Sequence, residues 1–404
     1  MRQADLEGLF SLRGKVKLDL GPMRRLLSRL GNPQNNLRIV HFAGTNGKGS
    51  TLVTLESLLL ASGFSVSSFI SPHLVRFNER FRVDGNESSD QAVEAALSTV
   101  CEALGIEIAD LASAEEKQLG ASFFEISFAM ALLIGQSSEW MLVETGLGGR
   151  LDATNGIEAP EACIITRVGL DHMEYLGSTL EEIALEKLGI FKQGAKVFLA
   201  PQETIVANLA RVQAEALGLS LYEASTEDVP ALELGLLGSH QQENAATAYL
   251  AYQHLCPASR QLNEQALAHC LEQVCWPARL EMIGDRLLLD GAHNQAGLSS
   301  LLTFLKEKYS QQKILLGLGW MQGKELFNAF DPQGLDLTFL PLRGRFFGAE
   351  LSPETALEHI GPILAPRSIT QAYQDWQAGD LDRFDLVVFA GSLYLIGELK
   401  ALLA

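Results

Sequence analysis

The sequence predicts an α/β protein with two domains, each built on a mostly parallel sheet. Short β-branched runs alternate with amphipathic stretches along the whole chain, as in a parallel sheet covered on both faces. The 404 residues exceed the roughly 150 of one average domain. The strand–helix pattern restarts near residue 286, after Pro277 marks an element boundary. We therefore expect a larger domain over 1–276 and a smaller α/β domain over 277–404.

Apolar periodicity defines the elements expected in the larger domain. Leucines recur at helical spacing between residues 50 and 62, whereas the neighbouring apolar runs are short enough for strands. The predicted strands are Leu37–Phe42, Ser65–Ile70, Trp140–Glu144, Cys163–Val168, Lys196–Leu199 and Leu219–Tyr222. The predicted helices are Ser50–Ser62, Phe123–Gly135 and Glu264–Val274.

The smaller domain repeats the same alternation over fewer elements. We predict strands at Arg286–Asp290, Lys313–Leu318 and Asp385–Ala390, with a helix at Ala296–Lys308 and a further helix after the last strand.

Composition excludes several classes of protein. The chain has 49 acidic and 31 basic residues, a net charge of −18, which argues against nucleic-acid binding and against docking on an anionic membrane. No apolar stretch reaches the roughly 20 residues of a membrane span. Five cysteines without CxxC spacing form neither a disulfide framework nor a zinc site. We therefore expect a cytoplasmic protein that acts on small molecules. We also expect a monomer, although composition does not determine the oligomeric state.

The most specific motif is HFAGTNGKGST, from His41 to Thr51, between a predicted strand and a predicted helix. Glycines in such a loop let the backbone approach phosphates, and the helix N-terminus favours anions. Lys48 is placed to reach the β- and γ-phosphates. Phe42 and Gly49 depart from the usual G-x-x-x-x-G-K-[ST] pattern. The residues predicted to bind ATP here are Gly44, Thr45, Asn46, Gly47, Lys48, Gly49 and Ser50.

The segment Gly-Thr-Asn-Gly-Lys-Gly-Ser resembles the ATP loop of the Mur ligase superfamily, in the branch of folylpolyglutamate and dihydrofolate synthases. Further blocks resemble this family in order from about Asp19 to Glu398. The resemblance implies an N-terminal P-loop ATPase domain of the Mur ligase central-domain type, followed by a Rossmann-like glutamate ligase C-terminal domain.

Polar residues at predicted strand ends are candidate metal ligands. A carboxylate at a strand end suits Mg²⁺, and the resemblance implies that Ser71, Glu144 and His172 hold one ion. In this superfamily the lysine matching Lys187 is commonly carbamylated, which would help to hold a second Mg²⁺. The alternative for Lys187 is a helix-surface lysine paired with Glu186 or another neighbour.

Three further residues resemble nucleotide-binding positions of the family. Asn244 lies in a block whose asparagine contacts ATP, Arg279 in a Pro-Gly-Arg-like block with Ala278 in place of glycine, and Asp290 in an Asp-x-Ala-His-Asn block. The alternative for Arg279 is a surface arginine paired with Glu281.

The folate and glutamate sites are expected from weaker matches. The segment Leu18–Gly21 resembles the pterin loop of bifunctional family members. The pterin candidates are Asp19, Leu20, Gly21, Phe124 and Asp152, and the candidates for the incoming glutamate are Arg80, His293 and Ser392.

The resemblance implies an ATP-dependent amide ligase. It would add L-glutamate to dihydropteroate and to the γ-carboxyl of reduced folates through an acyl phosphate, with Lys48, His293 and Lys187 as catalytic residues. Because candidate ligands come from both domains, we expect domain closure before chemistry. A monofunctional folylpolyglutamate synthase, another Mur-type ligase with a UDP-linked substrate, and a non-catalytic ATP-binding regulatory protein remain alternatives.

Overall fold

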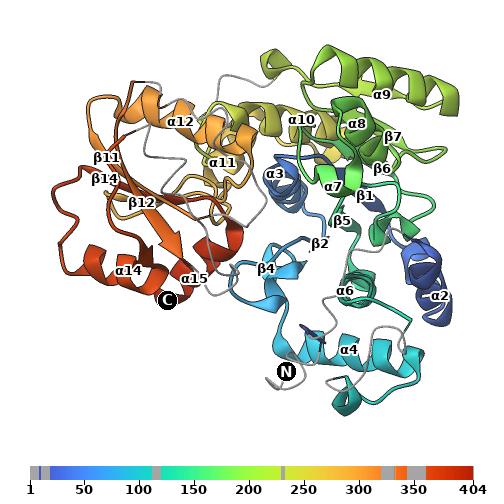
Figure 1. Ribbon diagram of the computed structural model, residues 1–404. Helices are drawn as coiled ribbons and strands as arrows, with labels where there is room; N and C mark the ends of the chain where they lie inside the picture. The colour runs from blue at the N-terminus through green and yellow to red at the C-terminus, as the bar shows by residue number, and fades with distance from the viewer. Residues whose placement is uncertain are drawn as a thin grey trace. The chain divides into compact units, whose positions relative to one another are not determined.

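A computed structural model describes residues 9–10, 19–111, 120–228, 233–319, 332, 334–343 and 361–403. The chain forms two compact units, each with its own sheet (Figure 1). The first unit comprises Met1–His73, Phe77–Glu233 and Glu243–Val274, and the second comprises Leu74–Arg76, Leu234–Gln242 and Cys275–Ala404.

The first unit contains an eight-stranded sheet in the order β4-β3-β2-β5-β1-β6-β7-β8. Its strands are β1 (Ile39–Ala43), β2 (Val66–Phe69), β3 (Phe81–Val83), β4 (Asn86–Glu87), β5 (Trp140–Glu144), β6 (Ala162–Ile165), β7 (Lys196–Leu199) and β8 (Leu221–Glu223). All neighbours pair in parallel except β2 with β3 and β3 with β4. The central strand β1 places Val40 opposite Leu142 on one side and Ala162 on the other.

Helices cover both faces of this sheet. Side chains alternate between faces along a strand. Val197 and Leu199 of β7 therefore pack in one core with α8 and α9, while Phe198 contacts His254 of α10 on the opposite face. The helices that share a core with Leu199 are α8 (Leu180–Leu188) and α9 (Thr204–Leu217). A second core of the first unit contains α2 (Gly21–Arg29), α4 (Asp90–Leu104) and α6 (Phe123–Ile134). Those grouped with α10 (His240–Leu255) are α3 (Lys48–Ala61) and α11 (Glu264–Gln273).

Local sequence explains where the best-defined helices begin. Helix α6 starts at a capping box, in which the Ser122 side chain accepts from the Glu125 backbone and the Glu125 side chain accepts from the Ser122 backbone. Apart from Ser127, whose hydroxyl donates to the Phe123 carbonyl, the remainder of α6 is apolar on all sides, as expected for a helix buried between the sheet and α4.

The second unit contains a six-stranded sheet in the order β13-β12-β11-β14-β10-β9. Its strands are β9 (Glu281–Ile283), β10 (Leu287–Leu289), β11 (Lys313–Leu318), β12 (Asp336–Arg343), β13 (Arg367–Ser368) and β14 (Leu386–Ala390). Only β9 pairs antiparallel. Its helices are α12 (Gln295–Tyr309), α14 (Ile369–Gln377) and α15 (Leu393–Leu403).

The predicted α/β class with two mostly parallel sheets is confirmed. The strand predicted over Cys163–Val168 is too long, because β6 ends at Ile165 and the carbonyl of Arg167 then turns to the phosphate loop. The short antiparallel strands were not predicted, and neither was β12, which contains Pro341 near its end.

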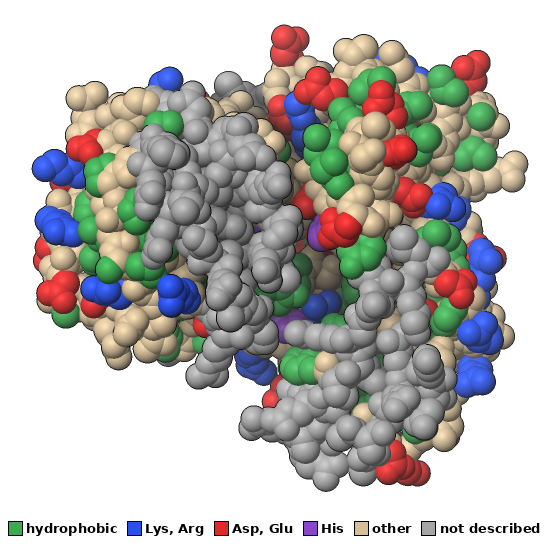
Figure 2. Space-filling view, in the orientation of Figure 1, with side chains coloured by type: hydrophobic (Ala, Val, Ile, Leu, Met, Phe, Trp, Pro, Cys, Tyr) green, Lys and Arg blue, Asp and Glu red, His purple; other side chains and the backbone are tan. Residues whose placement is uncertain are grey.

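Acidic and basic side chains are interspersed on the face shown in Figure 2. None of the described helices is both long enough and apolar enough to cross a membrane.

Candidate functional site

The phosphate loop follows β1, and its backbone is held by the segment that follows β6. The N–H groups of Thr45 and Asn46 donate to the carbonyl of Arg167 at 2.9 and 3.1 Å, and Thr45 Oγ1 lies 2.9 Å from the Gly169 carbonyl. Gly44 and Gly47 have φ values of +155° and +88°. A Cβ on Gly47 would lie 2.2 Å from Asn244 Oδ1, so only glycine fits this turn.

The side chain of Lys48, the first residue of α3, lies against this loop. Its Nζ donates to the carbonyls of Gly44 and Thr45 at 3.1 and 3.3 Å and lies 3.9 Å from Glu144 Oε1. An ammonium group in this position can offset the negative charge of a phosphate bound by the loop.

Ser71 and Glu144 lie together, after β2 and at the end of β5. The Ser71 backbone N–H donates to Glu144 Oε2 at 3.1 Å, and the Glu144 residue is 6% exposed. Since Mg²⁺ is usually held by one or two carboxylates together with substrate phosphates, this pair fits such an ion. In the described ranges, no group of three or more His, Cys, Asp and Glu side chains could form a metal site.

His172, the third predicted metal ligand, lies in the segment after β6 that holds the phosphate loop. It adopts a left-handed backbone conformation, with φ 52°, at the start of the short helix α7 (Met173–Leu176). Its Nε2 lies 4.0 Å from Asp171 Oδ1, and its side chain is 39% exposed. The side chain is thus accessible to a ligand, with a carboxylate beside it.

Lys187 lies inside the first unit rather than on its surface. It is 4% exposed, and its Nζ donates to the Gly44 carbonyl at 3.0 Å. Burial and the nearby Lys48 lower its pKa to about 7, although Asp171 and Asp152 act in the opposite direction. The alternative of a surface lysine paired with Glu186 is wrong, because Glu186 pairs with Arg150 instead. The amine of Lys187 is therefore partly neutral near pH 7.

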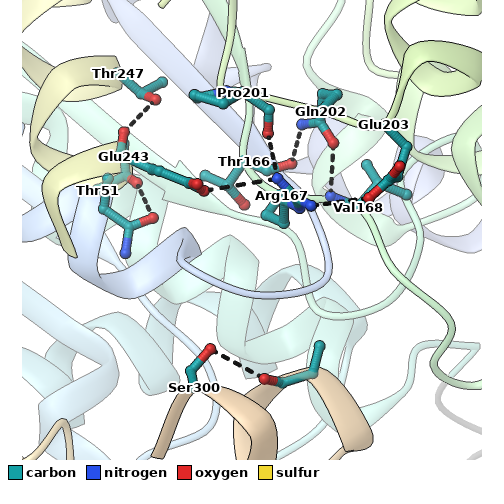
Figure 3. Close-up of polar contacts among 12 residues, drawn as sticks. Thr51, Thr166, Arg167, Val168, Pro201, Gln202, Glu203, Glu243, Thr247 and Ser300 are labelled. Atoms are coloured by element: carbon teal, nitrogen blue, oxygen red, sulfur yellow. Dashed lines mark hydrogen bonds and ion pairs between the residues drawn. The ribbon is translucent and has the colours of Figure 1, made fainter. Parts of the chain in front are cut away.

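Asn244 on α10 contacts the phosphate-loop helix, and its neighbour Glu243 joins a polar cluster around Arg167 (Figure 3). Thr51 Oγ1 lies 3.4 Å from Asn244 Oδ1. The Arg167 guanidinium contacts Glu203 at 3.0 Å and Glu243 at 3.9 Å. Arg167 was not predicted from the sequence, because its contacts depend on the spatial proximity of α10, the segment after β6 and the β7–α9 loop.

Two of the pterin candidates meet at the loop after β5. Asp152 is buried, and its Oδ2 accepts the N–H groups of Gly146 and Leu147 at 3.0 and 2.8 Å. The Phe124 ring covers Gly146 so closely that a Cβ there would lie 2.6 Å from it. Burial raises the pKa of Asp152, whereas the hydrogen bonds it accepts lower it. Asp152 and Phe124 thus shape the same loop.

The other pterin candidates lie at the start of α2. The Gly21 N–H donates to Asp19 Oδ1 at 2.9 Å, and Asp19 is exposed whereas Leu20 is half-buried. Leu18, the first residue of the matched segment, lies outside the described residues. Helix α2 itself packs against the short helix Ala153–Gly156, next to Asp152.

Arg80, predicted to bind glutamate, is buried in the first unit. Its Nε donates to His73 Nδ1 at 2.8 Å, and its guanidinium lies 5.1 Å from the centre of the Phe123 ring. The other two glutamate candidates, His293 and Ser392, belong to the second unit.

In the second unit, candidate residues gather at the ends of the neighbouring strands β10 and β14. The buried Asp290 carboxylate accepts the N–H groups of Leu280 and Ala292 at 2.9 and 2.8 Å. Burial raises the pKa of Asp290, while Arg279 lowers it. Glu281 pairs with Lys400, so the alternative of an Arg279–Glu281 pair is wrong.

His293 and Ser392 lie at the same strand ends. His293 Nδ1 lies 2.8 Å from the Gly291 carbonyl, so this nitrogen carries the hydrogen. Ser392 lies two residues after the end of β14, is 4% exposed and accepts the N–H of Tyr394 at 3.2 Å.

Known sequences and solved structures both resemble this chain. No family model matches the chain. The dihydrofolate synthase/folylpolyglutamate synthase of Bacillus subtilis is 34% identical over 345 residues, covering 78% of each chain. The Escherichia coli protein of the same name is 30% identical over 402 residues, covering 94% of this chain and 90% of its own.

Solved structures agree with these relatives. Escherichia coli FolC in complex with DHPP and ADP matches with a TM-score of 0.81 and 26% identity, covering 100% of this chain and 99% of that one. The bifunctional folylpolyglutamate synthase/dihydrofolate synthase of Yersinia pestis, complexed with AMPPNP and a Mn ion, matches with a TM-score of 0.78, 25% identity and the same coverage. The chain therefore belongs to the dihydrofolate synthase/folylpolyglutamate synthase family.

Proposed function

We propose that this protein is an ATP-dependent ligase that joins L-glutamate to dihydropteroate and to the γ-carboxyl group of reduced folates. The observation that carries the proposal is the arrangement around Gly44. The carbonyl of Gly44 accepts from both Lys48 and Lys187, and Glu144 lies beside Lys48. The loop shaped by Asp152 begins directly after Glu144, so a phosphate site and a candidate folate site are adjacent in the first unit.

The reaction requires activation of a carboxylate, because amide formation from a carboxylate is unfavourable in water. The acceptor carboxylate attacks the γ-phosphorus of ATP, the bond to the β–γ bridging oxygen breaks, and an acyl phosphate and ADP form. The amine of L-glutamate then attacks the acyl carbon, phosphate leaves and the amine loses a proton. The protein mainly positions the reactants and neutralises charge. Lys48 offsets the charge on the γ-phosphoryl group.

A divalent metal ion fits beside this loop. We propose that Ser71, Glu144 and His172 hold Mg²⁺, which when bound would orient the phosphates and offset their charge.

We propose that Lys187 is carbamylated in the active enzyme and helps to hold a second ion. In that modification the neutral amine attacks CO₂, an N–C bond forms, one C=O bond becomes a carboxylate, and the amine proton passes to solvent. The lowered pKa of Lys187 supports this, because a substantial fraction of its amine is neutral near pH 7.

The remaining predicted residues keep their proposed roles. Residues 1–276 would form the ATP- and folate-binding domain, and 277–404 the glutamate ligase C-terminal domain. We propose that Asn244, Arg279 and Asp290 contact the nucleotide. Asp19, Leu20, Gly21, Phe124 and Asp152 would form the pterin site. Arg80, His293 and Ser392 would bind the incoming glutamate.

The proposal includes the setting in which the enzyme acts. The cysteines are all free thiols, which is typical of a reducing compartment and supports a cytoplasmic location. We propose a monomer with small-molecule substrates and no nucleic-acid or membrane partner.

The deciding experiment is ATP-dependent incorporation of L-glutamate, run in parallel with dihydropteroate and with tetrahydrofolate. Turnover of both acceptors is expected. Turnover of tetrahydrofolate alone would indicate a monofunctional folylpolyglutamate synthase and remove the proposed role of Asp19–Gly21. Turnover of neither would contradict the proposal and leave a UDP-linked acceptor or a regulatory ATP-binding protein to be tested.

A further inference from the structure

Three buried side chains form a hydrogen-bonded chain from β1 to the loop that follows β5. His41 Nε2 lies 2.8 Å from Thr154 Oγ1, and Thr154 Oγ1 lies 2.5 Å from Asp152 Oδ1. His41 and Thr154 are both 0% exposed. Neither has a role in the proposed reaction, although His41 precedes the phosphate-loop residue Gly44 by only three positions.

The acceptors fix the direction of these hydrogen bonds. Asp152 accepts two backbone N–H groups at Oδ2 and the Thr154 N–H at Oδ1. The Thr154 hydroxyl hydrogen is therefore donated to Asp152 Oδ1, and the hydroxyl oxygen accepts from His41. His41 must then be the neutral tautomer with its hydrogen on Nε2. Burial and the charge of Lys192 lower the pKa of His41 to about 3, which agrees with a neutral ring.

This arrangement has a cost for stability. Within the described part of the chain, no hydrogen-bond partner reaches the buried His41 Nδ1, and an unpaired buried acceptor destabilises a fold. His41 sits on the central strand between Val143 and Cys163, an environment in which aliphatic side chains are typical. Packing alone therefore does not explain a histidine at this position.

We propose that His41 and Thr154 are positioning residues for the folate acceptor. They hold the loop that follows β5, which Asp152 shapes, at a fixed distance from β1, the strand that carries the phosphate loop. The inference rests on the proposed function, since it places the pterin acid against the loop that Asp152 shapes and Phe124 covers. In-line transfer requires the acceptor carboxylate to approach the γ-phosphorus to about 3–3.5 Å. A fixed spacing between the acceptor loop and the phosphate loop supplies that alignment.

The test uses paired variants of both residues. Thr154→Val and His41→Leu remove the donors, whereas Thr154→Ser and His41→Gln keep a hydroxyl and an N–H donor near the original atoms. We expect Thr154→Val, which loses a hydrogen bond to a charged group, to raise KM for dihydropteroate and tetrahydrofolate about tenfold. His41→Leu loses a hydrogen bond between neutral groups and should raise the same KM values about fivefold. KM for ATP should change less than about twofold in both variants. The second pair should restore most of the affinity.

Thermal unfolding separates positioning from general stability. His41→Leu removes the unpaired Nδ1 acceptor, so its Tm should equal or exceed that of the wild type while acceptor binding weakens. The inference would be overturned if KM for the acceptors and KM for ATP rose equally. It would also be overturned if Tm fell without any change in KM for the acceptors. Thr54→Val is the matched control, because Thr54 is also buried and its hydroxyl bonds only the Ser50 carbonyl of its own helix.

A binding measurement keeps this test independent of turnover. Calorimetric titration of dihydropteroate in the presence of AMPPNP should give about tenfold weaker binding to Thr154→Val than to wild type. Equal affinity for the two proteins would overturn the inference even if the wild type proves to be an active ligase. If wild-type protein binds no dihydropteroate, the proposed dihydrofolate synthase activity fails, and the same titration with tetrahydrofolate decides the inference: equal affinity of wild type and Thr154→Val for tetrahydrofolate would overturn it.

Discussion

Replacing Lys187 by methionine should change how the stability of the first unit depends on pH. In the folded protein the pKa of Lys187 is about 7, against 10.5 for an ordinary lysine. Between these values the unfolded chain binds a proton that the folded chain does not, so the stability of the wild type rises with pH across this window and falls as pH decreases towards 7. The Lys187→Met variant lacks this contribution.

The magnitude follows from the two pKa values. A displacement from 10.5 to about 7 is equivalent to about 5 kcal/mol, at about 1.4 kcal/mol per pH unit. Only part of the window is accessible to experiment. Between pH 7 and pH 9 the wild type should gain about 2 kcal/mol of unfolding free energy relative to Lys187→Met.

The assay is urea unfolding at several pH values in bicarbonate-free buffer, so that Lys187 remains an amine. Trp140 is buried in β5 of the first unit, and its fluorescence reports that unit when the other three tryptophans are replaced by phenylalanine. Lys196→Met, at a partly exposed lysine of β7, is the matched control for removing a lysine side chain from the same sheet. A difference between wild type and Lys187→Met that stays constant from pH 7 to pH 9 would refute the assigned environment of this amine.

Three further variants test the phosphate loop, the metal site and a strained turn. Gly47→Ala should raise KM for ATP at least about tenfold, because the left-handed backbone of this residue disfavours a side chain and the new Cβ would displace Asn244. An unchanged KM for ATP would contradict this loop geometry. Glu144→Gln should raise the Mg²⁺ concentration needed for half-maximal activity about tenfold or more, since an amide is a weaker ligand than a carboxylate; titration of activity with Mg²⁺ measures this. Ala278 has φ 58°, so Ala278→Gly should relieve about 1–2 kcal/mol of strain. Added chain entropy of about 0.5–1 kcal/mol and the loss of a buried methyl group, about 0.8 kcal/mol, nearly offset this gain, so Tm should change little. A large fall in Tm for Ala278→Gly would contradict the strain assigned to this turn.

Local signals in the sequence were sufficient for the fold class and for the phosphate loop. Strand β5 was predicted with its observed bounds, because a short apolar run bounded by turn-forming residues identifies a strand within a few positions of the sequence. The loop from Gly44 to Lys48 was also recognisable from a short contiguous motif, because Gly44 and Gly47 adopt positive φ angles that favour glycine.

The chemical state of the site depends on residues that are distant in sequence. Lys187 lies 143 positions from the carbonyl it contacts, and only its burial distinguishes a partly neutral amine from a surface lysine. The His41–Thr154 contact spans 113 positions, and the contacts of Arg167 join segments that no local pattern connects. Apolar runs and periodicity thus predicted most of the parallel strands of both sheets and several of the helices that cover them, because these depend on short-range hydrogen bonding and amphipathicity. Tertiary packing alone decided which polar groups are buried together, because pKa values and donor directions are set by the whole surrounding structure.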